Sequence, residues 1–117
     1  MPTFVFAYRS AKGHRPSTET GQAWRSWFDS MKGSLVDLGQ PVIDRTALGN
    51  QDADGTELGG YSLVAADDLD AAVAIARGCP ALSSGGGVEV GELGDVGDVA
   101  DPLADPEHRV SAGSLRK

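Results

Sequence analysis

The sequence predicts a small α+β domain whose elements follow one another in the order β-α-β-β-α-β. Two segments have apolar residues at helical spacing, and apolar segments of strand character flank each of them. The chain has 117 residues, of which 40% are hydrophobic and 23% are charged. This length and composition suit a globular protein with one core.

The first predicted strand covers residues 3–9. Its aromatic residues alternate with small aliphatic ones, in the order Phe4, Val5, Phe6, Ala7 and Tyr8. Because both sets are apolar, we expect a central strand that is buried on both faces. The polar segment 10–16 contains a glycine and a proline and is predicted as a loop.

The first predicted helix begins at Ser17 or Thr18, either of which is a suitable N-cap. Its apolar residues have the spacing of a single helical stripe: Trp24, Trp27, Phe28, Met31 and Leu35. Leu38 and Gly39, followed by Pro41, predict the end of this helix.

Two more strands are expected after the first helix, over residues 41–48 and 61–66. The polar, glycine-containing segment 49–57 between them is predicted as the tip of a hairpin.

A second helix is expected to start at Asp67 or Asp68 as its N-cap and to end before Pro80. Four apolar residues form its predicted inner face: Leu69, Ala72, Val73 and Ala76. Residues 88–93 then alternate as a last strand.

The chain changes character after residue 93. Residues 94–117 are acidic, contain prolines and lack a sustained apolar period. We therefore expect a folded domain over residues 1–93 and a tail over 94–117 that is extended unless it docks on a partner.

This order of elements is that of the split β-α-β, or ferredoxin-like, fold. Right-handed crossovers place both helices on one face of a four-stranded antiparallel sheet. The opposite face would be bare, although the strands are apolar on both sides. We therefore expect a homodimer in which two sheet faces pair into a barrel, with coverage by the acidic tail as the alternative.

Several classes of function are not expected. A net charge of −7 and a pI of about 4.6 argue against nucleic-acid binding, which requires a positive surface. The single Cys79 forms neither an internal disulfide nor a zinc site, and no metal or cofactor is predicted. Neither a signal peptide nor an apolar run long enough for a membrane span is predicted, so we expect a cytoplasmic protein.

The second half of the sequence resembles the YCII-related family, including its DGPF-domain branch. Four segments carry the resemblance: Gly59-Gly60-Tyr61-Ser62-Leu63-Val64, Ala66-Asp67-Asp68-Leu69-Asp70-Ala71-Ala72-Val73, Ala76-Arg77-Gly78-Cys79-Pro80 and Gly86-Gly87-Val88-Glu89-Val90. The opening strand, which ends in Phe6-Ala7-Tyr8, fits as well. The similarity covers roughly residues 1–93 and implies a dimeric α/β barrel with a cleft between sheet and helices.

Some members of this family carry a proposed His-Asp pair on and near the first helix. The resemblance places Asp37 at the position of that Asp, whereas Phe28 stands at the position of the His. The Asp-Gly-Pro-Phe motif is replaced by Asp54-Gly55-Thr56-Glu57.

Four residues are candidates for the wall of a ligand cleft beside the first helix: Tyr8, Arg9, Trp24 and Tyr61. The guanidinium of Arg9 suits a carboxylate or phosphate, and the aromatic rings suit a small apolar molecule. The alternatives are a surface Arg paired with an acid and aromatic residues that only pack in the core. Cys79 is interpreted as a small buried filler.

His14 and Asp37 are the candidates for proton transfer, against the alternative of a solvated loop His and a solvated turn acid. Three functions remain open at this point. The first is binding of a small anionic or aromatic molecule without chemistry. The second is an enzyme that transfers protons on a small organic acid or lactone. The third is an interaction or regulatory module that uses the acidic tail.

Overall fold

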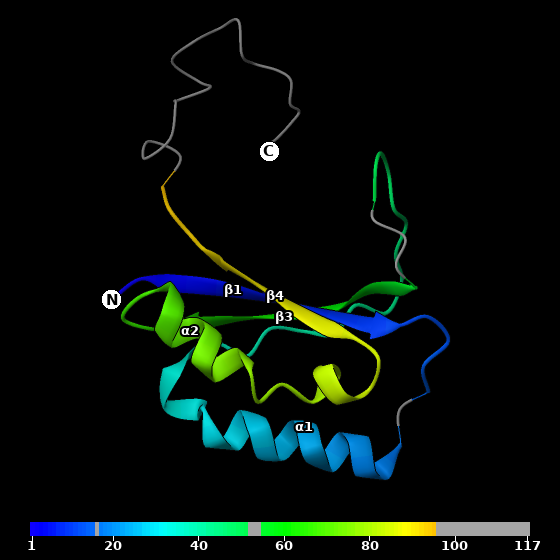
Figure 1. Ribbon diagram of the computed structural model, residues 1–117, viewed down its shortest axis with the longest axis horizontal. Helices are drawn as coiled ribbons and strands as arrows, with labels where there is room; N and C mark the ends of the chain where they lie inside the picture. Colours follow the sequence, from blue (N-terminus) through cyan, green and yellow to red (C-terminus); the bar gives the residue numbers. More distant parts are fainter. Residues whose placement is uncertain (16, 52–54, 96–117) are drawn as a thin grey trace, which may run out of the picture.

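The computed structural model describes residues 1–15, 17–51 and 55–95. Within these residues, four strands form one antiparallel sheet in the order β2-β3-β1-β4. The helices α1 and α2 both cover the same face of the sheet (Figure 1). The predicted α+β fold class and order of elements are therefore confirmed.

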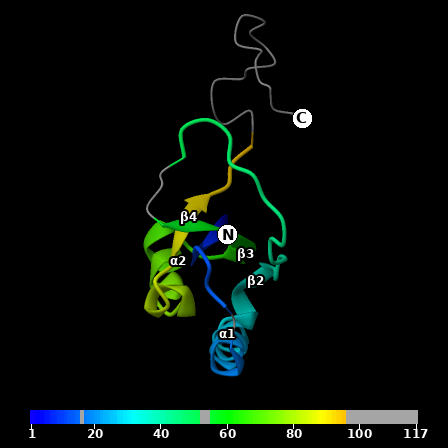
Figure 2. The same ribbon diagram turned by 90° about the vertical axis from the view of Figure 1, so that its right-hand side faces the viewer.

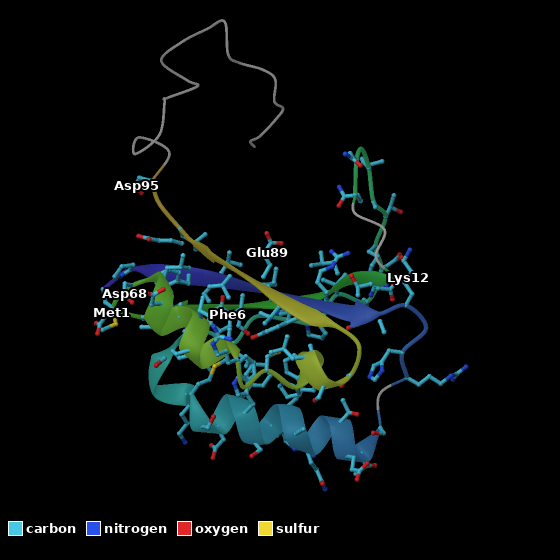
Figure 3. All side chains as sticks on the ribbon, viewed as in Figure 1. Met1, Phe6, Lys12, Asp68, Glu89 and Asp95 are labelled. Carbon is cyan, nitrogen blue, oxygen red and sulfur yellow. The ribbon has the colours of Figure 1, made fainter. Side chains whose placement is uncertain are left out.

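Strand β1 (Thr3–Ala11) lies in the middle of the sheet between β3 (Thr56–Ala65) and β4 (Gly87–Glu92). Alternate side chains of β1 point to opposite faces of the sheet. Phe4, Phe6 and Tyr8 point toward the helices and are 0%, 0% and 6% exposed. Figure 3 shows Phe6 on the helix side of the sheet and Glu89 of β4 on the opposite side.

Helix α1 (Thr18–Ser30) begins as expected, with the hydroxyl of Ser17 accepting a hydrogen bond from the backbone N–H of Thr20 at 3.1 Å. It ends earlier than predicted. A 3-10 turn, η1 (Lys32–Ser34), follows it, and the chain then enters strand β2 (Leu35–Asp37), which pairs with β3. Gly33 favours this tighter turn, and Leu35 is therefore a strand residue beside Val64 rather than a helical one.

The strand predicted over residues 41–48 is wrong. Only Pro41 forms an isolated bridge, with Gly60, and the chain leaves the sheet after Val42, whose N–H still donates to the carbonyl of Gly59. A proline lacks the N–H that a ladder requires, and Ile43 and Leu48 are 90% and 79% exposed. We call residues 42–51 the arm. It projects from the face of the sheet that the helices leave uncovered (Figures 1 and 2).

Helix α2 (Leu69–Ala76) is capped by Asp68, whose carboxylate accepts from the N–H of Ala71 at 2.8 Å. Ala72 and Ala76 are buried as predicted, whereas Leu69 is 48% exposed and not on the inner face. A second 3-10 turn, η2 (Pro80–Ser83), connects α2 to β4.

The uncovered side of the sheet, here the open face, carries small aliphatic residues that are half-buried in a single chain: Val5, Ala7, Leu63 and Ala65. Tyr61 lies opposite Ala7 on β1 and is 39% exposed. The predicted tail lies outside the described residues from 96 onward. In the described part of the chain, no helix is both long and apolar enough to cross a membrane.

Candidate functional site

A cavity of about 420 Å³ lies between α1, the neighbouring strands β1 and β3, and the segment that follows β2. This volume falls within the usual range for small-molecule sites. Its lining combines aromatic and apolar residues (Tyr8, Trp24, Phe28, Leu38, Pro41 and Tyr61), polar residues (Ser10, His14, Thr20 and Gln40) and glycines (Gly21, Gly39, Gly59 and Gly60). The cavity therefore lies beside the first helix, where the sequence predicted a cleft.

Three aromatic rings form one wall. Trp24 and Phe28 are one helical turn apart on α1, with ring centroids 5.5 Å apart. The ring of Tyr8 meets Trp24 edge to face at 4.9 Å and 77°. Such edge-to-face contacts hold the rings in fixed positions and leave apolar faces available to a flat ligand.

The two tryptophans have different roles. Trp24 is partly exposed and lines the cavity. Trp27 is 8% exposed, and its indole N–H donates to the carbonyl of Ile75 at 3.3 Å, so it belongs to the core that joins α1 to α2.

Backbone makes up much of the opposite wall. The N–H of Tyr61 donates to the carbonyl of Gln40 at 3.3 Å, and the N–H of Val42 donates to the carbonyl of Gly59 at 3.0 Å. Gly39 has φ of 78°, and a Cβ there would overlap the carbonyl oxygen of Tyr61. Sequence reasoning missed this wall, although the Gly59-Gly60 pair signals a close approach of two backbones.

A buried hydrogen-bond chain backs the aromatic wall. The hydroxyl of Tyr8 donates to Ser62 Oγ at 2.9 Å, and Ser62 donates to the carbonyl of Leu38 at 2.6 Å. Ser62 is 0% exposed. Burial raises the pKa of Tyr8 to about 12, so its phenol stays neutral at physiological pH.

The structure brings three of the four predicted wall residues to the cavity: Tyr8, Trp24 and Tyr61. Tyr61 borders it where its carbonyl lies against Gly39, while its register places the side chain on the open face. Arg9 lies outside the lining. Its guanidinium donates to the hydroxyl and the carbonyl of Thr56 at 3.1 and 3.2 Å, on the next strand.

The two proton-transfer candidates are separated. His14 lines the cavity at its edge. Asp37 is exposed and outside the lining, where its carboxylate accepts from the N–H of Gly39 at 2.9 Å. A base needs to be desolvated and near its substrate, so this placement does not favour proton transfer by Asp37.

Cys79 is 3% exposed, and burial raises the pKa of its thiol to about 11. A neutral, buried thiol is a poor nucleophile, which agrees with its interpretation as a filler. Across the described residues, no three His, Cys, Asp or Glu side chains come together as metal ligands would.

The lining contains no Asp, Glu, Lys or Arg. His14 and the two tyrosines are its titratable residues. An apolar, uncharged wall with a few hydroxyl, amide and imidazole groups suits a neutral molecule better than an ion, because an ion would lose its hydration without gaining an opposite charge.

Comparisons with known proteins support the fold. No family model and no curated protein matches the sequence. Among solved structures, the chain is similar to 5-chloro-2-hydroxyhydroquinone dehydrochlorinase from Burkholderia phenoliruptrix AC1100, solved in complex with 2,5-dihydroxybenzoquinone. The TM-score is 0.52 at 14% sequence identity, covering 84% of this chain and 99% of the other. At this identity the similarity establishes a shared α+β fold.

Proposed function

We propose that this protein, a member of the YCII-related family, binds a small, uncharged aromatic molecule in the cavity between α1 and β3. The observation that carries the proposal is the combination of a 420 Å³ cavity, an aromatic wall and a lining without Asp, Glu, Lys or Arg side chains. Of the two ligand classes expected from the sequence, this lining favours the aromatic over the anionic one, because Arg9 contacts Thr56 instead.

The structural neighbour supports a small-molecule role. That dehydrochlorinase holds 2,5-dihydroxybenzoquinone, a small ring with oxygen substituents. A cavity of the size found here accommodates a single ring with polar substituents.

The proposal is tested by filling the cavity from the helix side. Gly21 lines the cavity on α1, and a Cβ there would have no close neighbour except the end of Arg25 at 4.0 Å. We expect Gly21→Leu to keep the fold, since it replaces a helical glycine, and to weaken binding of 4-ethylphenol at least tenfold by calorimetry.

Ala23→Leu is the matched control. Ala23 is exposed on the same helix and faces a separate groove, so this variant should bind like the wild type. Equal affinity in Gly21→Leu and Ala23→Leu would place the binding site elsewhere. Absence of binding to any small aromatic molecule would refute the proposal.

An enzyme is the second candidate, and the observation that favours it is the imidazole of His14 at the cavity edge. An imidazole within hydrogen-bond reach of a bound hydroxyl is the kind of group that acts as a general base. Under this candidate, His14→Gln would bind the aromatic molecule as the wild type does but would lose turnover. If the wild type and His14→Gln both bind the aromatic molecule and neither converts it, the protein binds without catalysis, as in the first proposal.

We also propose a cytoplasmic homodimer in which each copy covers the open face of the other. The open face carries Val5, Ala7 and Leu63 beside Glu89 of β4, and the arm on the same side exposes Ile43 and Leu48, which are 90% and 79% exposed in a single chain. Two apolar features on one side are self-complementary under a two-fold axis, since each arm can lie on the partner's sheet.

Light scattering after size exclusion tests the dimer. We expect the wild type to be a dimer, Ile43→Lys and Leu63→Lys to shift it toward monomer, and Leu82→Lys to leave it unchanged. Leu82 is 49% exposed but lies in η2, on the helix side of the sheet. A monomeric wild type would contradict the dimer and would favour coverage of the face by the chain's own tail.

A further inference from the structure

We infer that the chain of hydrogen bonds from Tyr8 through Ser62 to the carbonyl of Leu38 fixes Tyr8 as a hydrogen-bond acceptor toward the cavity. The cavity would therefore select aromatic molecules that carry an O–H or N–H donor over molecules of the same size that carry only acceptors. This inference rests on the proposed aromatic site and names the chemical class of its ligand.

The direction of the chain follows from its last member. The carbonyl of Leu38 has no proton, so in the 2.6 Å contact Ser62 must be the donor. A serine hydroxyl has one proton, and this proton is therefore committed to the carbonyl. In the 2.9 Å contact between the two hydroxyls, Tyr8 must then be the donor.

Tyr8 is left with acceptor capacity alone. Its hydroxyl proton is directed at Ser62 Oγ, and Ser62 is 0% exposed. The phenol hydroxyl cannot rotate to offer that proton to a ligand without breaking this buried hydrogen bond. The high pKa of Tyr8, about 12, supports this state because the phenol keeps its proton. Tyr8 lines the cavity and only 6% of the residue is exposed, so little water competes at its surface, and we place the remaining lone pair of its oxygen toward the cavity.

The other polar groups of the lining do not oppose this selection. The hydroxyl of Ser10 donates or accepts by rotating, and the amide of Gln40 offers both kinds of group. The hydroxyl of Thr20 shares a 2.9 Å hydrogen bond with Ser17 Oγ in which either atom can be the donor, so it too can present a donor or an acceptor. They adapt to either class of ligand, whereas the Tyr8 oxygen does not. A carbonyl or carboxylate beside it would meet a lone pair and leave both oxygens without a donor.

The test compares ligands of equal heavy-atom number. 4-Ethylphenol carries an O–H donor, acetophenone carries only an acceptor, and benzoate adds a negative charge. We expect the wild type to bind 4-ethylphenol roughly tenfold more tightly than acetophenone by calorimetry, and benzoate more weakly still.

Two substitutions locate the cause of this preference. Tyr8→Phe removes the acceptor, so the ratio of the two affinities should fall to about one. Ser62→Ala releases the Tyr8 proton, so the ratio should fall at least threefold. Thr20→Val removes a lining hydroxyl outside the chain and should change both affinities by the same factor.

The outcomes separate this inference from the proposed function. If neither 4-ethylphenol nor acetophenone binds the wild type, the aromatic site and the inference both fail. If both bind with equal affinity, or if the preference survives in Tyr8→Phe, the site stands and the inference is wrong. A ratio unchanged in Ser62→Ala alone would also overturn it, since Ser62 would then not hold the proton.

Discussion

The two faces of the sheet are built from alternate residues of the same strands, yet they differ in kind. On the helix side, Phe4, Phe6 and Val64 are fully buried. On the open face, Val5, Ala7 and Leu63 are smaller or aliphatic and only half-buried. The helix side is complete within one chain, whereas the open face has apolar surface that a single chain does not cover.

In our proposal, ligand binding and assembly divide between these two faces. The cavity lies on the completed side, where α1 and the aromatic rings fix its walls. The arm lies on the incomplete side (Figure 2). Substitutions on one face should therefore affect folding and binding, and substitutions on the other should affect association.

The largest expected effect is at Phe6. Because its ring is fully buried against Trp27, Phe6→Ala should lower the free energy of unfolding by about 3–5 kcal/mol in urea denaturation. Val5→Ala, the neighbour on the open face, should cost about 1 kcal/mol at low protein concentration. If a second copy covers this face, the cost of Val5→Ala should grow with concentration, whereas that of Phe6→Ala should not. Equal costs would contradict the division between the faces.

Gly39 tests the backbone wall of the cavity. Gly39 and Gly49 have similar φ angles of 78° and 73°, but only at Gly39 would a Cβ meet other atoms. Gly39→Ala should therefore lower the free energy of unfolding by about 3 kcal/mol and weaken ligand binding. Gly49→Ala, in the arm, should cost about 1 kcal/mol and leave binding unchanged. Similar losses in both variants would mean that conformation alone, without close packing, requires Gly39.

Alkaline pH tests the burial of Tyr8 and Cys79. Their pKa values rise from 10.0 to about 12 and from 9.0 to about 11, so the folded state holds both protons more tightly than the unfolded state does. Stability should therefore be constant below pH 9 and fall as pH rises to 12, by about 2 kcal/mol for each group. Urea denaturation from pH 7 to 11 in Tyr8→Phe and Cys79→Ala should each show a smaller decline. A decline that both variants share in full with the wild type would assign it to other groups.

The smallest effect is expected where the arm meets β3. Arg45 and Glu57 form an ion pair at 3.1 Å with side chains 31% and 33% exposed. A double-mutant cycle with Arg45→Ala and Glu57→Ala should give a coupling below about 1 kcal/mol that disappears in high salt. A larger, salt-independent coupling would show that the pair is buried in the assembled protein.

Local patterns were sufficient to predict much of the fold. The alternation of Phe4 to Tyr8 predicted the central strand, and Ser17 and Asp68 were among the expected caps. The second strand was misplaced because Leu35 satisfies both the helical period and the strand that it actually forms. The position of one apolar residue in the pattern does not distinguish a helix from a strand at Leu35. The pairing of Leu35 with Val64 in the sheet decides for the strand.

The candidate site was predictable in its aromatic part only. Tyr8 and Trp24 could be placed near one cleft because each lies on a recognisable element. The other side depends on the approach of residues 38–42 to β3, where the Gly59-Gly60 pair signals a close contact but does not identify the partner segment, and on the β1–β3 register that takes Arg9 to Thr56. Ser62 carries no signal in the sequence, since its role arises from contacts with Tyr8 and Leu38, which are distant along the chain.

The most direct test of the aromatic cavity is a titration of the two indole N–H resonances by NMR with 4-ethylphenol, assigned with Trp24→Phe. Trp24 lines the cavity, whereas the indole N–H of Trp27 is bound to the carbonyl of Ile75 in the core. We predict that the Trp24 resonance shifts with saturation while that of Trp27 moves much less. A Trp24 resonance that stays in place at millimolar ligand, or a shift confined to Trp27, would contradict the proposed site.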